Sequence, residues 1–153
     1  MRNDKFRPYA AVYLLPIKDN KVLLSRRFNT GYMDGWYSLV AGHIDGNEPA
    51  TDATIREARE EAGIVVRAKD LTCVHIMDRY SPIQADNIPR EYIDFFFTVS
   101  TWQGEPTIME PDKCDELLWV DLNEIPEQTI DYVKHMIECY KNKVFYSEVG
   151  WTT

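Results

Sequence analysis

Residues 42–64 constrain this chain more than any other segment, because their charge pattern and flanking residues define one amphipathic helix. At about 100° per residue, Glu57, Glu60 and Glu61 fall within an arc of about 100° on such a helix. The opposite arc carries small or apolar residues that can face a core, namely Thr51, Ile55, Ala58 and Ala62. The pattern therefore predicts a helix with an apolar back and a front of clustered carboxylates.

The sequence also marks both ends of this helix. Pro49 is typical of the first helical position, which puts Glu48 at or near the N-cap. Gly63 stands where helices commonly end in the left-handed conformation, and residues 45–47 are typical of a turn. We expect a helix of about 13 to 14 residues between these limits.

Three carboxylates on one helix face repel one another, so a partner must offset that cost. A divalent cation does so, and hard oxygen ligands select magnesium, manganese or calcium. The alternative is a solvated helix held by pairs of opposite charge four residues apart. That alternative explains the glutamate and arginine content of the segment but not its flanking glycines.

The segment resembles the signature of the Nudix hydrolase family, with the MutT-like members as the nearest comparison. That signature is a glycine, five residues, a glutamate, seven residues, and then Arg-Glu-apolar-x-Glu-Glu-x-Gly-apolar. Every fixed position is filled, by Gly42, Glu48, Arg56, Glu57, Ala58, Glu60, Glu61, Gly63 and Ile64. The resemblance covers residues 7–140 and implies an α/β protein with the Nudix fold, an α/β/α sandwich around a mixed central sheet.

The resemblance also implies a metal centre that holds Mg²⁺, or alternatively Mn²⁺. The implied ligands are Glu57, Glu60, Glu61 and a backbone carbonyl of Ala41 or Gly42. Arg56 would pair with glutamates such as Glu48 and hold the carboxylates in place, since a loose carboxylate is a poor magnesium ligand. Bound metal would neutralise a diphosphate and activate water for in-line attack at phosphorus.

A carboxylate would then take the proton of the water as general base. Glu57 is one candidate. Glu110 is the other, because the Glu-Pro pair in the loop of residues 104–115, followed after three residues by a further glutamate, resembles the loop acid of MutT-type members. The competing interpretation of Glu110 is a solvated loop acid, and the sequence leaves both open.

Candidates for binding the substrate lie outside this segment. Arg26 and Arg27 end a predicted strand, and since adjacent strand residues point to opposite faces, at most one is expected to reach the site. Arg27 matches better the phosphate-contacting arginine of similar enzymes, although pairing with surface acids is an alternative for it. Lys113 is a weaker candidate of the same kind.

Aromatic residues before the signature could hold a nucleobase. Tyr32, Met33 and Trp36 lie in that loop, where a flat base could stack on them, or where they could simply pack in the core. Thr129 stands where MutT-like relatives carry a base-reading asparagine after a proline. A threonine offers fewer directed hydrogen bonds than an amide, which argues against discrimination for an oxidised guanine.

Hydrophobic alternation and turn residues organise the rest of the chain. The predicted strands are residues 9–17, 21–28, 36–40, 65–78 (as one strand or two), 91–102 and 117–120, with Asp19 and Asn20 as a turn. Residues 129–140 have helical periodicity, with Ile130, Val133, Ile137 and Tyr140 on one face. No repeat, linker or low-complexity segment divides the chain, so we expect a single domain over residues 1–153.

The C-terminal tail is unusually apolar and should pack on the domain or on a second subunit of a homodimer. Its apolar residues are Phe145, Tyr146, Val149 and Trp151. The three cysteines are odd in number and far apart, which favours free thiols in a reducing cytosol. We therefore expect a cytoplasmic protein.

The charge and hydrophobicity of the chain exclude some classes of binding partner. The net charge is −8 and no basic run is present, which argues against a nucleic-acid polymer or an anionic membrane. No window of 18 apolar residues is present either, so no transmembrane helix is expected.

Taken with the resemblance, these features predict an enzyme that cleaves a small nucleotide, foremost a nucleoside triphosphate to monophosphate and pyrophosphate. ADP-ribose, a nucleotide sugar or a dinucleoside polyphosphate are alternative substrates. A non-catalytic Nudix-fold nucleotide sensor is the rival from another class. The full set of signature glutamates favours the enzyme.

Overall fold

β1 (Tyr9–Lys18) is the central strand of the computed structural model, which describes residues 4–82, 84 and 86–152. One edge of β1 pairs in parallel with β6 (Arg90–Val99). Its other edge pairs antiparallel with β4 (Val40–His43) and then, at Ile17 and Lys18, with β2 (Lys21–Arg27). The sheet therefore forks along this edge of β1.

The remaining strands extend the two branches. They are β3 (Tyr37–Ser38), β5 (Thr72–Ser81), β7 (Cys114–Asp121) and β8 (Tyr146–Val149). β5 is antiparallel to β6 and parallel to β8, whereas β2 is antiparallel to both β3 and β7. The sheet is mixed, as predicted.

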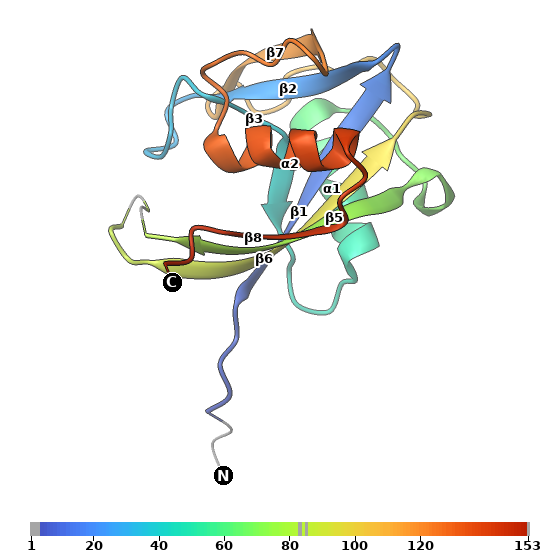
Figure 1. The fold of residues 1–153 in the computed structure, drawn as a ribbon. Coiled ribbons are helices and arrows are strands. Elements are labelled where there is room, and N and C mark those ends of the chain that lie inside the picture. The colour runs from blue at the N-terminus through green and yellow to red at the C-terminus, as the bar shows by residue number, and fades with distance from the viewer. Residues whose placement is uncertain (1–3, 83, 85, 153) are drawn as a thin grey trace.

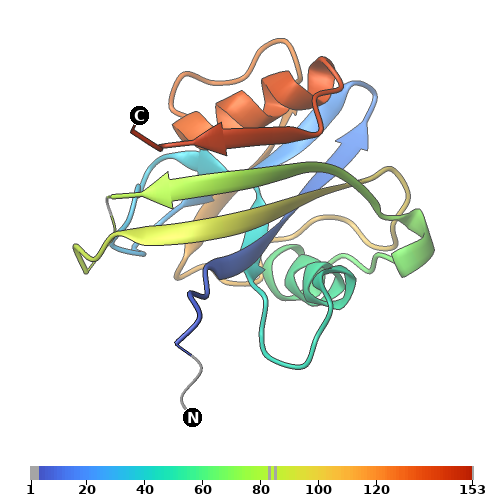
Figure 2. The ribbon, with the colours of Figure 1, turned by 60° about the horizontal axis from the view of Figure 1, so that its bottom comes forward.

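Two helices cover opposite faces of this sheet (Figures 1 and 2). They are α1 (Ala50–Ala62) and α2 (Asp131–Lys141). The arrangement confirms the predicted α/β/α sandwich. The predicted single domain also includes residues 1–3 and 153, which lie outside the described part of the chain.

Side-chain alternation along β1 divides the interior into two cores. Val12 and Leu14 pack in the core beneath α1. Ala11, Tyr13 and Leu15 face the other way, into the core that α2 closes. The predicted apolar face of α2 is confirmed, since Ile130, Val133 and Ile137 are all buried there.

Both ends of α1 agree with the prediction to within one residue. Pro49 is the N-cap, in extended conformation with φ −74° and ψ 161°, so the helix begins at Ala50 rather than at the proline. Gly63 ends it with φ 66°; its N–H donates to the carbonyl of Arg59, and the N–H of Ile64 donates to that of Ala58. Only a glycine adopts this left-handed conformation without a Cβ penalty.

The buried face of α1 is rotated from the predicted one. The buried residues are Ala53, Thr54, Glu57, Ala58 and Ala62. Thr51 and Ile55, which were expected to face the core, are only partly buried. Glu57 was expected to face away from the core and is buried, so that part of the prediction was wrong. Glu57 can face inward because it lies over Gly42, where the absence of a side chain leaves room for its carboxylate.

Three predicted segments differ in detail. The strand expected at residues 36–40 is divided into β3 and β4, and residues 65–78 contain a 3₁₀ turn (Ala68–Asp70) before β5 begins. The tail packs on the domain, the first of the two predicted alternatives, because it contributes β8, which pairs with β5. Asp19 and Asn20 form the predicted turn, with φ 53° and 61°.

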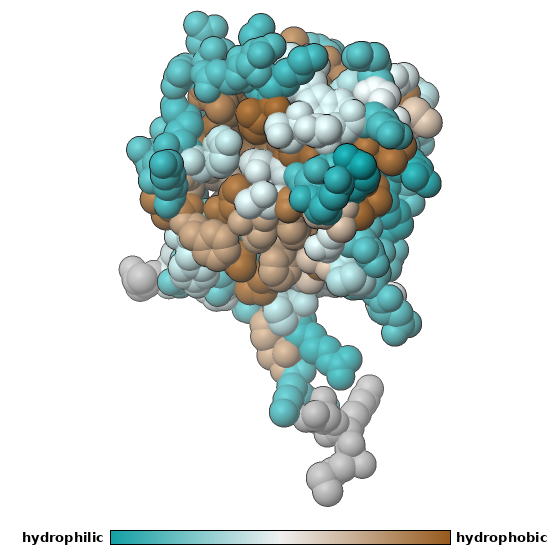
Figure 3. Space-filling view, turned by 90° about the vertical axis from the view of Figure 1, so that its right-hand side faces the viewer, coloured by the Kyte–Doolittle hydropathy of each residue, from teal (hydrophilic) through white to brown (hydrophobic). Residues whose placement is uncertain are grey.

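The surface and the cysteines show ordinary features. On the face turned to the reader in Figure 3, exposed apolar groups lie between hydrophilic ones, as on most folded domains. Cys73, Cys114 and Cys139 are free thiols. No helix in the described part of the chain is long and apolar enough to cross a membrane.

Candidate active site

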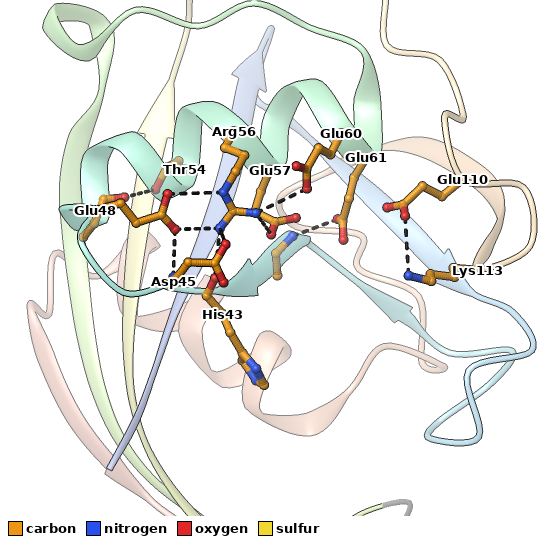
Figure 4. Close-up of polar contacts among 12 residues, drawn as sticks. His43, Asp45, Glu48, Thr54, Arg56, Glu57, Glu60, Glu61, Glu110 and Lys113 are labelled. Carbon is orange, nitrogen blue, oxygen red and sulfur yellow. Dashed lines mark hydrogen bonds and ion pairs between the residues drawn. The ribbon is translucent and has the colours of Figure 1, made fainter. Parts of the chain in front are cut away.

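Arg56 is the hub of the acidic helix face. Its guanidinium donates to Glu48 at 2.7 and 3.2 Å, to Glu57 at 2.7 Å, to Glu60 at 3.3 Å and to the carbonyl of His43 at 3.1 Å (Figure 4). The hydrogen bonds to Glu48 and Glu57 raise the pKa of Arg56 above its usual value. One arginine thus fixes three carboxylates relative to the loop before α1.

Glu57 is held between this arginine and the backbone of β4. Its side chain is almost buried, and its Oε1 lies where a β-carbon on residue 42 would have to be. Burial raises the pKa of Glu57, while the hydrogen bond from Arg56 lowers it. The carboxylate is therefore fixed in position on both sides.

Glu61 is the most strongly perturbed acid. Its Oε2 accepts a hydrogen bond of 3.0 Å from the N–H of Ala41. Burial, reinforced by the nearby charges of Glu57 and Glu110, raises the pKa of Glu61 to about 8. Burial penalises the ionised form, and the two neighbouring acids add to this, so a nearby positive charge would stabilise the carboxylate.

This donor set fits a divalent cation. Figure 4 shows the carboxylates of Glu57, Glu60 and Glu61 projecting from one side of α1, with Glu110 approaching from the opposite loop. Glu60 is the exposed member, with 53% of its side chain accessible. Within the described residues no three acidic, histidine or cysteine side chains form a ready-made metal site. Carboxylate oxygens are nevertheless the ligands that Mg²⁺ prefers, and here they outnumber their arginine partner.

A cavity of about 650 Å³ adjoins these acids, on the side of the sheet that faces α2. Glu61, Glu110 and Lys113 line it, and the Lys113 ammonium lies 3.5 Å from Glu110. The structure thus brings the predicted loop acid to the same space as the helix carboxylates.

The two neighbouring arginines of β2 separate as strand alternation requires. Arg27 lines the cavity and is braced by hydrogen bonds to the carbonyl of Tyr32 at 2.7 Å and to Thr30 at 3.0 Å. Arg26 pairs with Asp115 and Glu116 and is not among the lining residues. Tyr32 lines the cavity as well, beneath the Arg27 guanidinium.

Three predicted substrate contacts are not placed at the cavity. Trp36 and Met33 are partly buried and pack against the core beneath α2. Thr129 is fully buried at the start of α2, and its hydroxyl has no hydrogen-bond partner among the described residues. Neither Trp36 nor Thr129 is among the residues that line the cavity.

The structure adds a group of lining residues that were not predicted. Arg79 on β5 lines the cavity together with Tyr13, Tyr92 and Tyr132. They come from β5, β1, β6 and α2, and Tyr13 and Tyr132 are 119 positions apart. No local spacing connects them, so only the pairing of the strands brings them together.

Comparison with known proteins places the chain in one protein family. The family model described as the NUDIX domain matches residues 5–142. The chain is 32% identical to an ADP-ribose pyrophosphatase of Methanocaldococcus jannaschii, over 83% of this chain and 70% of that protein. It is 30% identical to an 8-oxo-dGTP diphosphatase of Proteus vulgaris, over 68% of this chain and 86% of that protein.

A solved structure supports the same fold. The crystal structure of a MutT NUDIX hydrolase from Burkholderia pseudomallei superposes with a TM-score of 0.76 at 26% identity. The match covers 87% of this chain and 98% of that one.

Proposed function

Because this chain belongs to the Nudix hydrolase family, whose members act on phosphoric anhydride bonds, we propose that it cleaves nucleoside triphosphates to monophosphate and pyrophosphate in a metal-dependent reaction. The observation that carries this proposal is that acidic and basic side chains line the same cavity. Glu61 of α1 and the loop acid Glu110 line a cavity whose other walls carry Arg27 and Lys113. Metal-binding carboxylates beside cationic side chains suit a polyphosphate chain.

In this proposal some acidic residues bind the metal and Arg56 orients them. Glu57, Glu60 and Glu61, with a carbonyl of Ala41 or Gly42, would hold Mg²⁺ or Mn²⁺. When bound, the metal supplies charge neutralisation and activation of water for in-line attack. Arg56 orients the carboxylates rather than touching the substrate, since its donors are taken up by them.

Glu110 is the better candidate for general base. Glu57 is almost buried and hydrogen-bonded to Arg56, so it has little freedom to accept a proton. Glu110 lines the cavity, and its carboxylate forms an ion pair of 3.5 Å with Lys113, longer than the 2.7 Å contact between Arg56 and Glu57. A general base must reach the proton it removes, and Glu110 has the access that this role needs.

Arg27 and Tyr32 supply contacts for the substrate. The Arg27 guanidinium would bind phosphate oxygens, and the ring of Tyr32, 5.4 Å from it, would flank the nucleotide. Trp36 and Thr129 would act indirectly, through the packing around the loop and α2.

ADP-ribose is the second candidate substrate. The relative from Methanocaldococcus jannaschii is named for that activity. The similarity to it extends over 83% of this chain, against 68% for the 8-oxo-dGTP diphosphatase of Proteus vulgaris. ADP-ribose shares the diphosphate and the nucleoside, so the same acids and Arg27 would serve it.

A substrate panel tests the proposal. The purified protein is incubated with Mg²⁺ and nucleoside triphosphates, dinucleoside polyphosphates, nucleotide sugars and ADP-ribose, and the products are separated by chromatography. We expect a monophosphate and pyrophosphate from a triphosphate, and a rate lower by about two orders of magnitude or more in the Glu60→Gln variant. Tight binding without turnover of any member would instead support a nucleotide sensor.

The cellular setting and oligomeric state are also part of the proposal. The three free thiols fit a reducing cytosol. Phe145, Tyr146 and Trp151 remain about half exposed on and beside the edge strand β8, where a second copy of the chain would cover them. Sedimentation at several concentrations distinguishes a monomer from a homodimer.

A further inference from the structure

Arg79 is a buried cation whose surroundings have no role in the reaction proposed above. It is 5% exposed, and its guanidinium binds Asp94, with Nε at 2.6 Å and Nη2 at 3.3 Å from the two carboxylate oxygens. Asp94 is fully buried. The pair is therefore charge-neutral as a unit and is shielded from solvent.

Two tyrosines cover both faces of this guanidinium. The Arg79 Cζ lies 4.3 Å from the ring centroid of Tyr92 and 4.0 Å from that of Tyr132. With both faces stacked, only the edge of the planar group is free to interact. Nη2 also donates to the Tyr13 hydroxyl at 3.3 Å, which leaves Nη1.

Nη1 has no hydrogen bond to another described residue. Within the described part of the chain, the Thr129 hydroxyl is the one buried side-chain nitrogen or oxygen atom without a partner. Nη1 is therefore not fully covered, and the space beside Arg79 is the cavity that it lines. A donor on a residue that lines a cavity is a means of recognising a ligand.

The charge balance indicates which ligand group belongs there. A phosphate beside Arg79 would meet the Asp94 carboxylate as well, so the neutral pair gives it little net attraction. By contrast, Arg27 acts electrostatically on Glu61 of the acidic helix, and Lys113 lies 3.5 Å from Glu110. A neutral acceptor oxygen matches the single free N–H edge, and the nearby hydroxyls of Tyr13 and Tyr132, 3.1 Å apart, can donate or accept a further bond.

The adjoining wall favours a flat ring as the carrier of that oxygen. Tyr9, His43 and Tyr92 form an aromatic group with ring centroids 5.6 to 5.9 Å apart, and all three line the cavity. Aromatic side chains pack well against a nucleobase. A hydroxyl group of a second sugar would offer the same acceptor chemistry without the flat ring.

We propose that Arg79 is a specificity-determining residue, which donates from Nη1 to a carbonyl oxygen of the substrate's nucleobase while Asp94, Tyr92 and Tyr132 fix its plane. This inference rests on the proposed nucleotide hydrolysis and names the part of the substrate that the inner cavity recognises. It separates the site into a metal-and-phosphate region and a base-reading region.

Arg79→Lys tests the assignment because it keeps a cation for Asp94 but loses the planar donor. The measurement is the ratio of kcat/KM for inosine triphosphate to that for purine riboside triphosphate, which lacks the carbonyl oxygen. We expect the wild-type ratio to exceed one and the variant to lower it about 10- to 100-fold, the effect of one charge-assisted hydrogen bond. Arg67→Lys, on an exposed arginine paired with Asp70, is the matched control and should leave the ratio unchanged.

Other results would overturn the proposal. An equal loss for both triphosphates would make Arg79 a structural residue, and an unchanged ratio would remove it from recognition. A loss confined to ADP-ribose would assign Nη1 to the second sugar rather than to the base.

A binding measurement on the unmodified chain covers the case in which the variant does not fold. Non-hydrolysable analogues of the two triphosphates are titrated into ¹⁵N-arginine-labelled protein with Mg²⁺. A shift of the Arg79 side-chain signal with the inosine analogue alone supports the inference, even if no substrate is turned over and the proposed hydrolysis fails. Equal shifts, or none, with both analogues would contradict it.

Discussion

The carboxylate of Glu57 occupies the space that a side chain on Gly42 would need. Gly42 is on β4 and Glu57 on α1, so this contact fixes the helix against the strand beside the cavity that Gly42 and Glu61 line. The glycine is therefore required by close approach and not by its backbone conformation.

Gly42→Ala should displace Glu57 and leave the fold in place, because the obstructing atoms are the end of a flexible side chain. Displacing an oriented carboxylate commonly costs about 10- to 100-fold in metal affinity or activity. Isothermal titration with Mn²⁺ and a turnover assay measure both. Gly46→Ala is the control, since a β-carbon there meets no atom within 4 Å. Equal effects of the two substitutions would show that the Glu57 contact is unimportant.

Glu60→Gln should lower turnover by about two orders of magnitude or more, on the scale of losing one charge-stabilising group. It should also reduce the rise in Tm that Mg²⁺ produces, because a ligand that binds only the folded state stabilises it. Thermal unfolding with and without Mg²⁺ measures the second effect. Glu124→Gln, at an exposed loop position, should keep both properties. A full Mg²⁺ response in the Glu60 variant would remove Glu60 from the metal centre.

Arg27→Ala should raise KM about tenfold or more with a smaller change in kcat, because it removes a charged hydrogen-bond donor to phosphate. Steady-state kinetics with the best triphosphate provides the test. The neighbouring Arg26→Ala removes the same charge from the strand but from the side that pairs with Asp115 and Glu116. If both variants raised KM equally, the effect would come from overall charge and not from a contact.

Glu110→Gln should lower kcat by about 10²- to 10⁴-fold, the usual contribution of a general base. The Tm increase with Mg²⁺ should persist, since this acid is not needed to hold the metal. Loss of that increase would identify Glu110 as a ligand instead. Normal kcat would return the role of base to Glu57.

The stability of the fold should fall as the pH drops below about 6.5, the ordinary pKa of histidine. His75 is fully buried, its Nδ1 bonds to the Val144 carbonyl at 2.8 Å, and its Nε2 bonds to the Ser147 hydroxyl at 2.7 Å. Burial lowers the pKa of His75, and the charge of His135 adds to this. Because the unfolded chain then binds more protons, this stability is present above pH 6.5 and is lost as the pH falls toward the folded-state pKa.

Urea unfolding between pH 5 and 8 measures this dependence. His75→Gln should flatten it, and His135→Gln, on the exposed side of α2, should change it less. An unaltered pH profile in the His75 variant would contradict the assignment.

The acidic helix could be predicted because its information is local. Periodicity, a proline and a glycine define the helix from Ala50 to Ala62 to within one residue. Its rotation could not be predicted, because inward placement of Glu57 depends on Gly42, which the spacing alone does not place beneath it. The carboxylate was expected on the helix front, away from the core, and it is buried because the strand beneath leaves room for it.

The rest of the site depends on contacts between distant segments. Strand alternation reduced Arg26 and Arg27 to one candidate and the resemblance favoured Arg27, but only the folded arrangement shows that Arg27 lines the cavity. No sequence pattern indicated that Arg79 belongs to the site. Its partners Asp94, Tyr13 and Tyr132 contact it because β5 pairs with β6 and α2 packs over the sheet. Trp36 fitted a stacking role by composition, yet it packs against the core.

The alternation along β1 has an evolutionary consequence. Its residues facing α1, such as Val12 and Leu14, support the catalytic helix, whereas Ala11 and Tyr13 form part of the cavity wall. A mutation at a cavity-facing position can alter which nucleotide is preferred without disturbing the support of the acids one residue away. Homologous proteins with this strand can therefore acquire new substrates by single substitutions while the hydrolytic chemistry is preserved.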